Sequence, residues 1–188
     1  MTRMSDDRLG ELYAGTLRLV ADLGFDNVTM DQIAEATKSS KATLYRQWGS
    51  KLALFVESLA NGAPVPEVAP DTGSLRGDLR EMFARREKDI EQPPELVGAT
   101  LQAMKQNAEL AEAVRARIIG PVNDRIDLFV RRAIDRGEVA SDCPAIPYIH
   151  LVLLAPYVLN EGLTGLEYDP DFVLAYIDGL VLPALGIH

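Results

Sequence analysis

Apolar residues along this chain recur mostly three or four positions apart, which is the repeat of one face of an α-helix. The first such run extends from Asp6 to Leu23 and is followed by Gly24, a residue that ends helices readily because it tolerates positive φ angles. The apolar-polar alternation that marks β-strands is nearly absent. The pattern therefore predicts an all-α protein.

Two short helices are expected after this first one. Thr29 and Gln32 have the spacing of a capping box at the start of the segment MDQIAEA, so each side chain can bond to the other's backbone N–H. The polar segment TKSS interrupts the pattern, and another short helix is expected from about Ser40 to Arg46. Ser50 is then placed to cap a further helix.

The remainder of the chain is also helical in pattern. The segment from Asn61 to Ser74 is rich in Pro and Gly and reads as a linker. The helices expected beyond it cover residues 75–91, 93–106, 108–136, 144–163 and 170–185, with Pro93, Pro144 and Pro170 in first turns. The chain is therefore expected to divide into an N-terminal domain, residues 1–60, and a helical C-terminal domain, residues 61–188.

Charge is distributed unevenly over these two parts. The whole chain has a formal net charge of -9, and residues 61–188 hold twelve Lys or Arg against twenty Asp or Glu. Between Glu35 and Glu57, by contrast, there are four cations and no anion. This contrast predicts a locally basic face on an acidic protein, with an ordinary solvated run of charge as the alternative.

The basic segment coincides with the two short helices. Two such helices joined by a tight turn and preceded by a third helix form a helix-turn-helix candidate, whose second helix enters the DNA major groove with its N-terminal residues leading. Here those residues are Ser40, Lys41, Ala42 and Thr43. Each is short or flexible enough to reach a base edge, a thymine methyl group or a phosphate.

The segment GFDNVTMDQIAEATKSSKATLYRQWGSKLALF resembles the TetR family of transcriptional regulators. The likeness extends from about Leu9 to Leu59, and the helical remainder is similar in architecture to the family's ligand-binding and dimerisation domain. The positions that match the family pattern are Gly24, Phe25, Thr29, Ile33, Ala34, Ser40, Lys41, Thr43, Leu44, Tyr45, Trp48, Lys51 and Leu54.

The resemblance implies roles for individual residues. It implies that Thr29 and the Tyr45 hydroxyl contact phosphates and that Lys51 meets another phosphate at the start of the fourth helix. It also implies that bases are read by Lys41, Ala42 and Thr43. Trp48 is expected to pack inside the domain, because aromatic side chains of this size fill cores.

The turn departs from the family pattern at two positions. Lys38 stands where the family usually has glycine, and Ser39 stands where it usually has an apolar residue. A lysine held in the left-handed conformation would cost about 1–2 kcal/mol unless the turn differs. We also hypothesise that Lys38 adds a phosphate contact.

Several other classes of function find no support in the sequence. There is no metal-site spacing of His, Cys and carboxylates, no Gly-rich phosphate loop and no nucleophile elbow, so we expect neither an enzyme nor a cofactor. The apolar stretch from Ala145 to Leu159 is too short for a confident membrane span. A single cysteine, Cys143, and the lack of a signal-peptide pattern fit a cytoplasmic protein.

The C-terminal part carries the remaining expectations. A small apolar effector is expected to bind there, with plain core packing as the alternative for each candidate residue. The candidates are Met82, Phe83, Leu101, Met104, Phe129, Tyr148, His150, Tyr157 and Asn160. The last two long helices are apolar over much of their circumference, which a homodimer interface would explain.

Together these expectations describe a repressor that an effector releases from a pseudo-palindromic operator on double-stranded DNA. The main alternative is a DNA-binding regulator that needs no ligand and is controlled by its abundance or by a protein partner. A helical enzyme is a more remote alternative.

Overall fold

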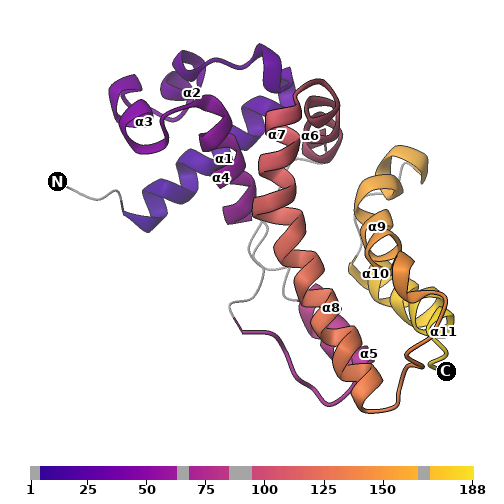
Figure 1. The fold of residues 1–188 in the computed structure, drawn as a ribbon. Helices are drawn as coiled ribbons and strands as arrows, with labels where there is room; N and C mark the ends of the chain where they lie inside the picture. Colours follow the sequence, from indigo (N-terminus) through magenta and orange to yellow (C-terminus); the bar gives the residue numbers. More distant parts are fainter. Residues whose placement is uncertain (1–4, 63–67, 85–94, 165–169) are drawn as a thin grey trace. The chain divides into compact units, whose positions relative to one another are not determined.

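The computed structural model describes residues 5–62, 68–84, 95–164 and 170–188, and within them every regular element is helical (Figure 1). The predicted all-α class is therefore confirmed. By their internal contacts the residues form two compact units, residues 1–64 with 90–119 and residues 65–89 with 120–188. The division into domains at residue 60 stays a prediction, and the described residues 95–119 have their contacts within the first unit.

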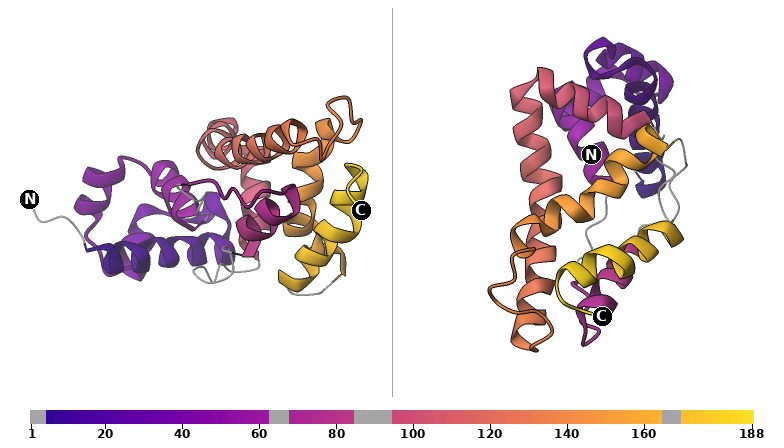
Figure 2. Two further views of the ribbon diagram at one scale, coloured as in Figure 1. Left: turned by 90° about the horizontal axis from the view of Figure 1, so that it is seen from below. Right: turned by 90° about the vertical axis from the view of Figure 1, so that its right-hand side faces the viewer.

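The first unit is built around α1, which packs against both α4 and α6 (Figures 1 and 2). Its fully buried core includes Leu12, Val20, Ile33, Leu44 and Phe55, one or more from each of the first four helices. The helices of this unit are α1 (Asp6–Leu23), α2 (Met30–Ala36), α3 (Lys41–Trp48), α4 (Lys51–Gly62), α6 (Glu95–Gln106) and α7 (Ala108–Val114), followed by the π-helical turn Arg115–Ile119.

The second unit has a separate core in which Leu75, Phe129, Ile177 and Leu182 are fully buried. Within it α5 packs against α8 and α10. Its helices are α5 (Leu75–Ala84), α8 (Gly120–Asp135), α9 (Ile149–Thr164), α10 (Pro170–Tyr176) and α11 (Leu182–Ala184), with the π-helical turn Ile177–Val181 between the last two.

One predicted helix start is wrong. A helix was expected from Pro144, but Pro144 lies in a turn, and a short 3-10 helix, Ile146–Tyr148, precedes α9. Pro147 contributes to the delay, because proline has no N–H to donate to the carbonyl oxygen four residues earlier. The α-helix therefore begins only at Ile149, once both prolines have been passed.

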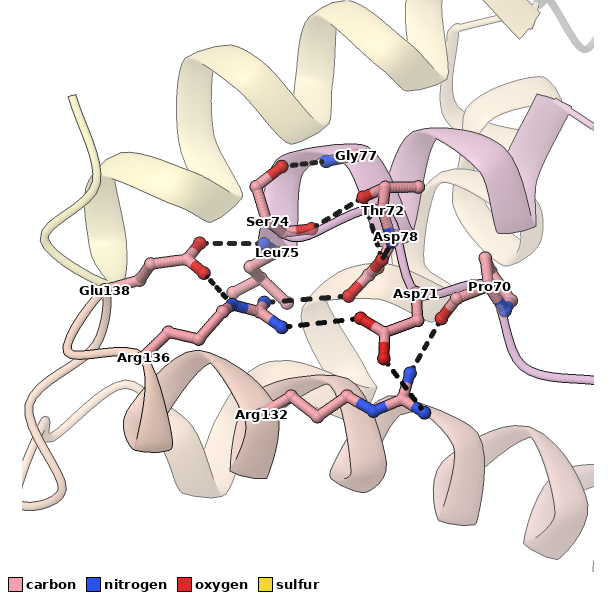
Figure 3. Close-up of polar contacts among 10 residues, drawn as sticks. All are labelled: Pro70, Asp71, Thr72, Ser74, Leu75, Gly77, Asp78, Arg132, Arg136 and Glu138. Atoms are coloured by element: carbon pink, nitrogen blue, oxygen red, sulfur yellow. Dashed lines mark hydrogen bonds and ion pairs between the residues drawn. The ribbon is translucent and has the colours of Figure 1, made fainter.

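The segment before α5 is folded tightly onto its first turn (Figure 3). Ser74 caps the helix, with its Oγ accepting from the Gly77 N–H at 3.1 Å. The buried Asp78 carboxylate accepts from the backbone N–H and the hydroxyl of Thr72, at 2.7 and 2.9 Å. A Cβ at Gly77 would lie 2.1 Å from the Thr72 Oγ1, so only glycine fits there.

Side chains from the last turn of α8 and from the residues that follow the helix hold this segment from outside (Figure 3). Arg132 donates to the Pro70 carbonyl oxygen at 2.8 Å, and Arg136 forms an ion pair with Asp78 at 3.7 Å. Glu138 accepts from the Leu75 N–H at 2.8 Å and also bonds Arg136. We call Thr72, Asp78, Arg132, Arg136 and Glu138 the α5 lock.

Candidate nucleic-acid interface

The start of α2 is fixed by the capping box expected from the sequence. Thr29 Oγ1 accepts from the Gln32 N–H at 3.2 Å, and Gln32 Oε1 accepts from the Thr29 N–H at 2.8 Å, so the prediction is confirmed. Val28 and Ile33 are both buried on either side of the cap, as in a hydrophobic staple. The cap leaves Thr29 itself exposed at the surface.

The turn between α2 and α3 is a Schellman motif closed by a lysine. The Ser39 N–H donates to the Ala34 carbonyl oxygen at 2.8 Å, and the Lys38 N–H donates to that of Glu35 at 3.1 Å. Lys38 has φ +50°, which is the left-handed conformation usually given to glycine. The turn therefore keeps the geometry of a glycine turn and carries the backbone strain that was expected of a lysine at this position.

The N-terminal half of α3 faces solvent. Ser40 is its N-cap, accepting from the Thr43 N–H at 3.1 Å, while the two hydroxyl groups lie 2.8 Å apart. Leu44 is fully buried and anchors the helix to the core. Lys41 and Ala42 are exposed and Thr43 is half-buried. Leu44 thus fixes α3 to the core, while the small polar and basic side chains in the N-terminal half of the helix point outward.

Lys41 already has a partner in the absence of DNA. Its ammonium lies 2.8 Å from the Asp31 carboxylate, at the first turn of α2, and this bond raises the pKa of Lys41. Both side chains are more than half exposed, so water and salt screen the pair strongly. An anion such as a phosphate can therefore displace Asp31 at small cost.

Lys51 is anchored within the protein. Its ammonium donates to the carbonyl oxygens of Phe25 and Val28, at 2.6 and 2.7 Å, and lies 4.3 Å from the centre of the Phe25 ring. Partial burial lowers the pKa of this lysine. Two of its three protons are used inside the unit, so a phosphate contact by Lys51, which stays a prediction, would use the third.

The two aromatic residues of the basic segment have different surroundings. Trp48 packs against the core and meets the Tyr13 ring edge-on, with 6.1 Å between ring centres, which confirms its expected place inside the domain. Tyr45 is exposed, at 46% of its full accessible surface. Its hydroxyl is therefore available to an external partner on the same side of the helix as Lys41.

The structure thus places most of the predicted DNA-contacting residues on α3 and the turn before it, while Thr29 precedes α2 and Lys51 begins α4. Two residues beside them were missed from the sequence, Asp31, which pairs with Lys41, and Arg8, which reaches the turn from α1. Nothing in the sequence indicates the Arg8 contact, because its partners lie about thirty positions away.

The residues proposed for an effector pocket are not gathered in one place. Met82, Phe83 and Phe129 are buried together in the core of the second unit, whereas Leu101 and Met104 belong to the first unit. Their proposed role stays a prediction. Tyr148 is largely exposed, and the side chains of Tyr157 and Asn160 lie outside the described part of the chain.

The second unit has two further polar features, a contact made by His150 and an open groove on α8. The His150 Nε2 lies 2.9 Å from a carboxylate oxygen of Asp127 on α8. Elsewhere on α8 there is an open groove of about 330 Å³ that contains none of the nine proposed residues. Its lining residues are Pro121, Asp124, Arg125, Leu128 and Arg131.

Within residues 5–62, 68–84, 95–164 and 170–188, no group of three or more His, Cys, Asp or Glu side chains is arranged to hold a metal ion. None of the helices described here combines the length and the apolar character needed to cross a bilayer.

Comparisons of the sequence and of the fold with known proteins point to the same protein family. Residues 12–57 match the family described as bacterial regulatory proteins, tetR family, and residues 69–180 match the tetracyclin repressor-like C-terminal domain. The DNA-binding transcriptional repressor TetR of Mycobacteroides abscessus is 32% identical over 185 residues, which cover 97% of this chain and 96% of that protein. The HTH-type regulator Rv1556 of Mycobacterium tuberculosis is 31% identical, with 93% and 86% covered.

Solved structures show the same fold at lower identity. The hemolysin II transcriptional regulator HlyIIR superposes with a TM-score of 0.63 at 15% identity, covering 96% of this chain and 97% of that one. The TetR family transcription regulator SCO0332 gives a TM-score of 0.57 at 23% identity, with 95% and 98% covered.

Proposed function

The chain belongs to the TetR family of DNA-binding transcriptional regulators, and we propose that within this family it is a homodimeric repressor released from a pseudo-palindromic operator by a small molecule. The observation that carries the proposal is the exposed, basic and hydroxyl-bearing N-terminal half of α3. The similarity to the Mycobacteroides abscessus repressor over nearly the whole of both chains supports repression as the proposed mode of control.

The proposed contacts divide into those that read bases and those that fix position. Lys41 and Thr43 can donate to acceptors in the major groove, and the Ala42 methyl group can meet a thymine methyl group. Phosphates would be bound by residues around them, which fix the position of α3 without reading sequence. The proposed phosphate contacts are Thr29, Lys38, Ser40, Tyr45 and Lys51.

The dimer is proposed to form through the C-terminal helices. Leu151 and Leu154 of α9 are 69% and 43% exposed, and Tyr148 and Phe172 are exposed as well. Large apolar side chains left exposed on these last helices favour a protein-protein contact. A two-fold axis through it would present two α3 helices to successive major grooves about 34–36 Å apart, on chromosomal DNA in the cytoplasm.

Release by an effector requires that the ligand prefer a form of the dimer that fits the operator poorly. The effector is proposed to bind at the candidate residues given by the sequence, of which Phe129 and His150 lie in the second unit and Leu101 and Met104 in the first. The close packing of Met82, Phe83 and Phe129 is the observation that favours the alternative, a regulator without a ligand.

Selection of bound fragments from random duplex DNA tests the proposed DNA-binding role. We expect an enriched palindrome whose half-sites are one helical turn apart. Lys41→Ala should lower affinity for this palindrome and relax preference at one position, while Arg18→Ala, which removes an exposed cation from α1, should leave base preference unchanged. Failure to enrich any palindrome would contradict the proposal.

The proposed dimer and the proposed release by an effector need separate measurements. Leu151→Arg should give a monomer in light scattering and abolish tight binding to the full palindrome, because only one half-site can then be occupied. A small molecule that binds with high affinity yet leaves operator affinity unchanged would argue against release by that ligand and favour the ligand-independent alternative.

A further inference from the structure

Arg8, near the start of α1, reaches the turn that precedes the recognition helix α3. Its Nη2 donates to the carbonyl oxygen of Thr37, to that of Lys38 at 3.2 Å and to the Ser39 hydroxyl at 3.4 Å. The other terminal nitrogen, Nη1, bonds Glu11 at 2.9 Å on the same helix. Glu11 thus orients the guanidinium so that one edge of it faces the turn.

These contacts act on the strained part of the chain. Lys38 has φ +50°, a conformation that a side-chain-bearing residue adopts only when its surroundings hold it there. The carbonyl oxygens of Thr37 and Lys38 lie beyond the last hydrogen-bonded turn of α2, where helices commonly leave such groups without partners. A guanidinium supplies several donors in a rigid plane, which suits it to hold neighbouring carbonyl groups in one arrangement.

The turn in its left-handed form determines where α3 begins. Ser40, the N-cap of α3, follows Ser39 directly, and Lys41 and Thr43 lie within the first turn after it. If Lys38 changed to a right-handed or extended conformation, the first turn of α3 would move relative to α2. The base-reading side chains would then be displaced, although the core contact of Leu44 could survive.

We propose that Arg8 is a positioning residue for DNA recognition, which clamps the left-handed turn at Lys38 and so compensates for the absence of glycine there. This proposal rests on the DNA-binding role proposed for α3. Arg8 acts through the turn and needs no contact with DNA.

The proposal makes a specific prediction about pairs of substitutions. Arg8→Met removes the clamp, whereas Lys38→Gly removes the need for it, because glycine adopts the left-handed conformation without strain. On a palindrome selected by the unaltered protein, Arg8→Met should weaken binding about five- to tenfold when residue 38 is lysine, the size of one lost base contact. In the Lys38→Gly background the same change should weaken binding less than about twofold.

Arg18→Met provides the matched control, since it removes one exposed cation from the same helix. Binding should be measured over a range of salt concentrations, at a temperature at which circular dichroism shows every variant to be folded. A loss of affinity with an unchanged salt slope, suppressed by Lys38→Gly, supports the proposal. A slope that falls by about 1 with no suppression would show that Arg8 contacts a phosphate and would overturn it.

A second measurement needs no DNA and separates this proposal from the function itself. Amide hydrogen exchange at Ser39, whose N–H is bonded to Ala34, should become faster in Arg8→Met and remain near its original rate in Arg18→Met. Unchanged exchange at Ser39 would overturn the clamp even if the protein binds its operator. If exchange changes as expected but no duplex is enriched from random DNA, the clamp stands and the proposed function fails.

Discussion

Two irregular segments of this protein are held by arginines from distant helices, and they are held in different ways. The turn before α3 contains a left-handed lysine, which one partly exposed arginine, Arg8, contacts at the surface. The first turn of α5 contains a glycine where no side chain fits, Gly77, and a fully buried carboxylate, Asp78, which holds the segment before the helix. The first arrangement rests on hydrogen bonds near the surface, whereas the second is fixed by burial.

The difference matches what each helix start is proposed to do. The side chains at the start of a recognition helix must stay exposed to reach DNA, so the bonds that hold this turn also lie near the surface, partly screened by water. The start of α5 belongs to the core of the second unit, where an unpaired polar group would be costly. We therefore expect substitutions in the α5 lock to change mainly stability, and substitutions around Lys38 to change mainly DNA binding.

The largest expected effect is at the centre of the α5 lock. Asp78→Ala would leave the Thr72 N–H without its acceptor and Arg136 without its buried partner. We expect the free energy of unfolding to fall by about 3–5 kcal/mol, because each of the two hydrogen bonds from Thr72 to the buried carboxylate contributes about 1.5–3 kcal/mol. Urea denaturation measures it, with Asp71→Ala as the control, because Asp71 pairs with Arg132 and Arg136 at the same segment but is 59% exposed.

Gly77→Ala tests whether fit, as well as charge, holds the same segment. The new Cβ would lie 2.1 Å from Thr72 Oγ1 and 2.8 Å from its Cβ, so Thr72 must move away from Asp78. Overpacking of this kind costs about 1–3 kcal/mol. Gly98→Ala is the matched control in α6, where nothing lies within 4 Å of the added methyl group and a gain of about 0.5–1 kcal/mol is expected. Equal effects at the two glycines would contradict the close fit.

The helix caps and the α5 lock differ in how well they could be predicted from the sequence. The caps at Thr29 and Ser50 were predicted, because a cap and its backbone partner lie only three residues apart. The α5 lock was not, because Glu138 bonds Leu75 across 63 positions and no local pattern records such a contact. Gly77 was equally hidden, since its reason is the position of Thr72 in three dimensions.

The candidate interface shows the same limit. The exposed residues at the start of α3 were predicted because a helix-turn-helix pattern fixes which end of the second helix leads. The bonds from Lys51 to the carbonyl oxygens of Phe25 and Val28 were missed, because lysine in a basic segment suggests an external anion. Long flexible side chains find partners that only the folded chain brings near.

At the turn itself, Lys38→Gly should have a smaller effect and one of opposite sign on stability. Relief of the left-handed lysine, reduced by the greater freedom of glycine in the unfolded chain, should raise the free energy of unfolding by about 0.5–1 kcal/mol. The melting temperature measures this gain. If Lys38 also contacts a phosphate, the salt slope of DNA binding should fall by about 1 in the same variant. An unchanged salt slope would show that Lys38 makes no phosphate contact and that its effect is backbone strain alone.

The smallest effect is expected at the pair of Lys41 and Asp31, where the interface should prove most adjustable. Asp31→Asn keeps the size of the side chain but removes the charge that competes with phosphate for the Lys41 ammonium, 2.8 Å away. Affinity for any duplex should rise about two- to threefold at low salt and converge with that of the unaltered protein at high salt, where the exposed pair is screened. Asp22→Asn, an exposed carboxylate on α1, controls for the change in net charge. If Asp31→Asn instead weakens binding, the carboxylate orients Lys41 towards the groove, and this exposed contact is as necessary for recognition as the buried Asp78 is for stability.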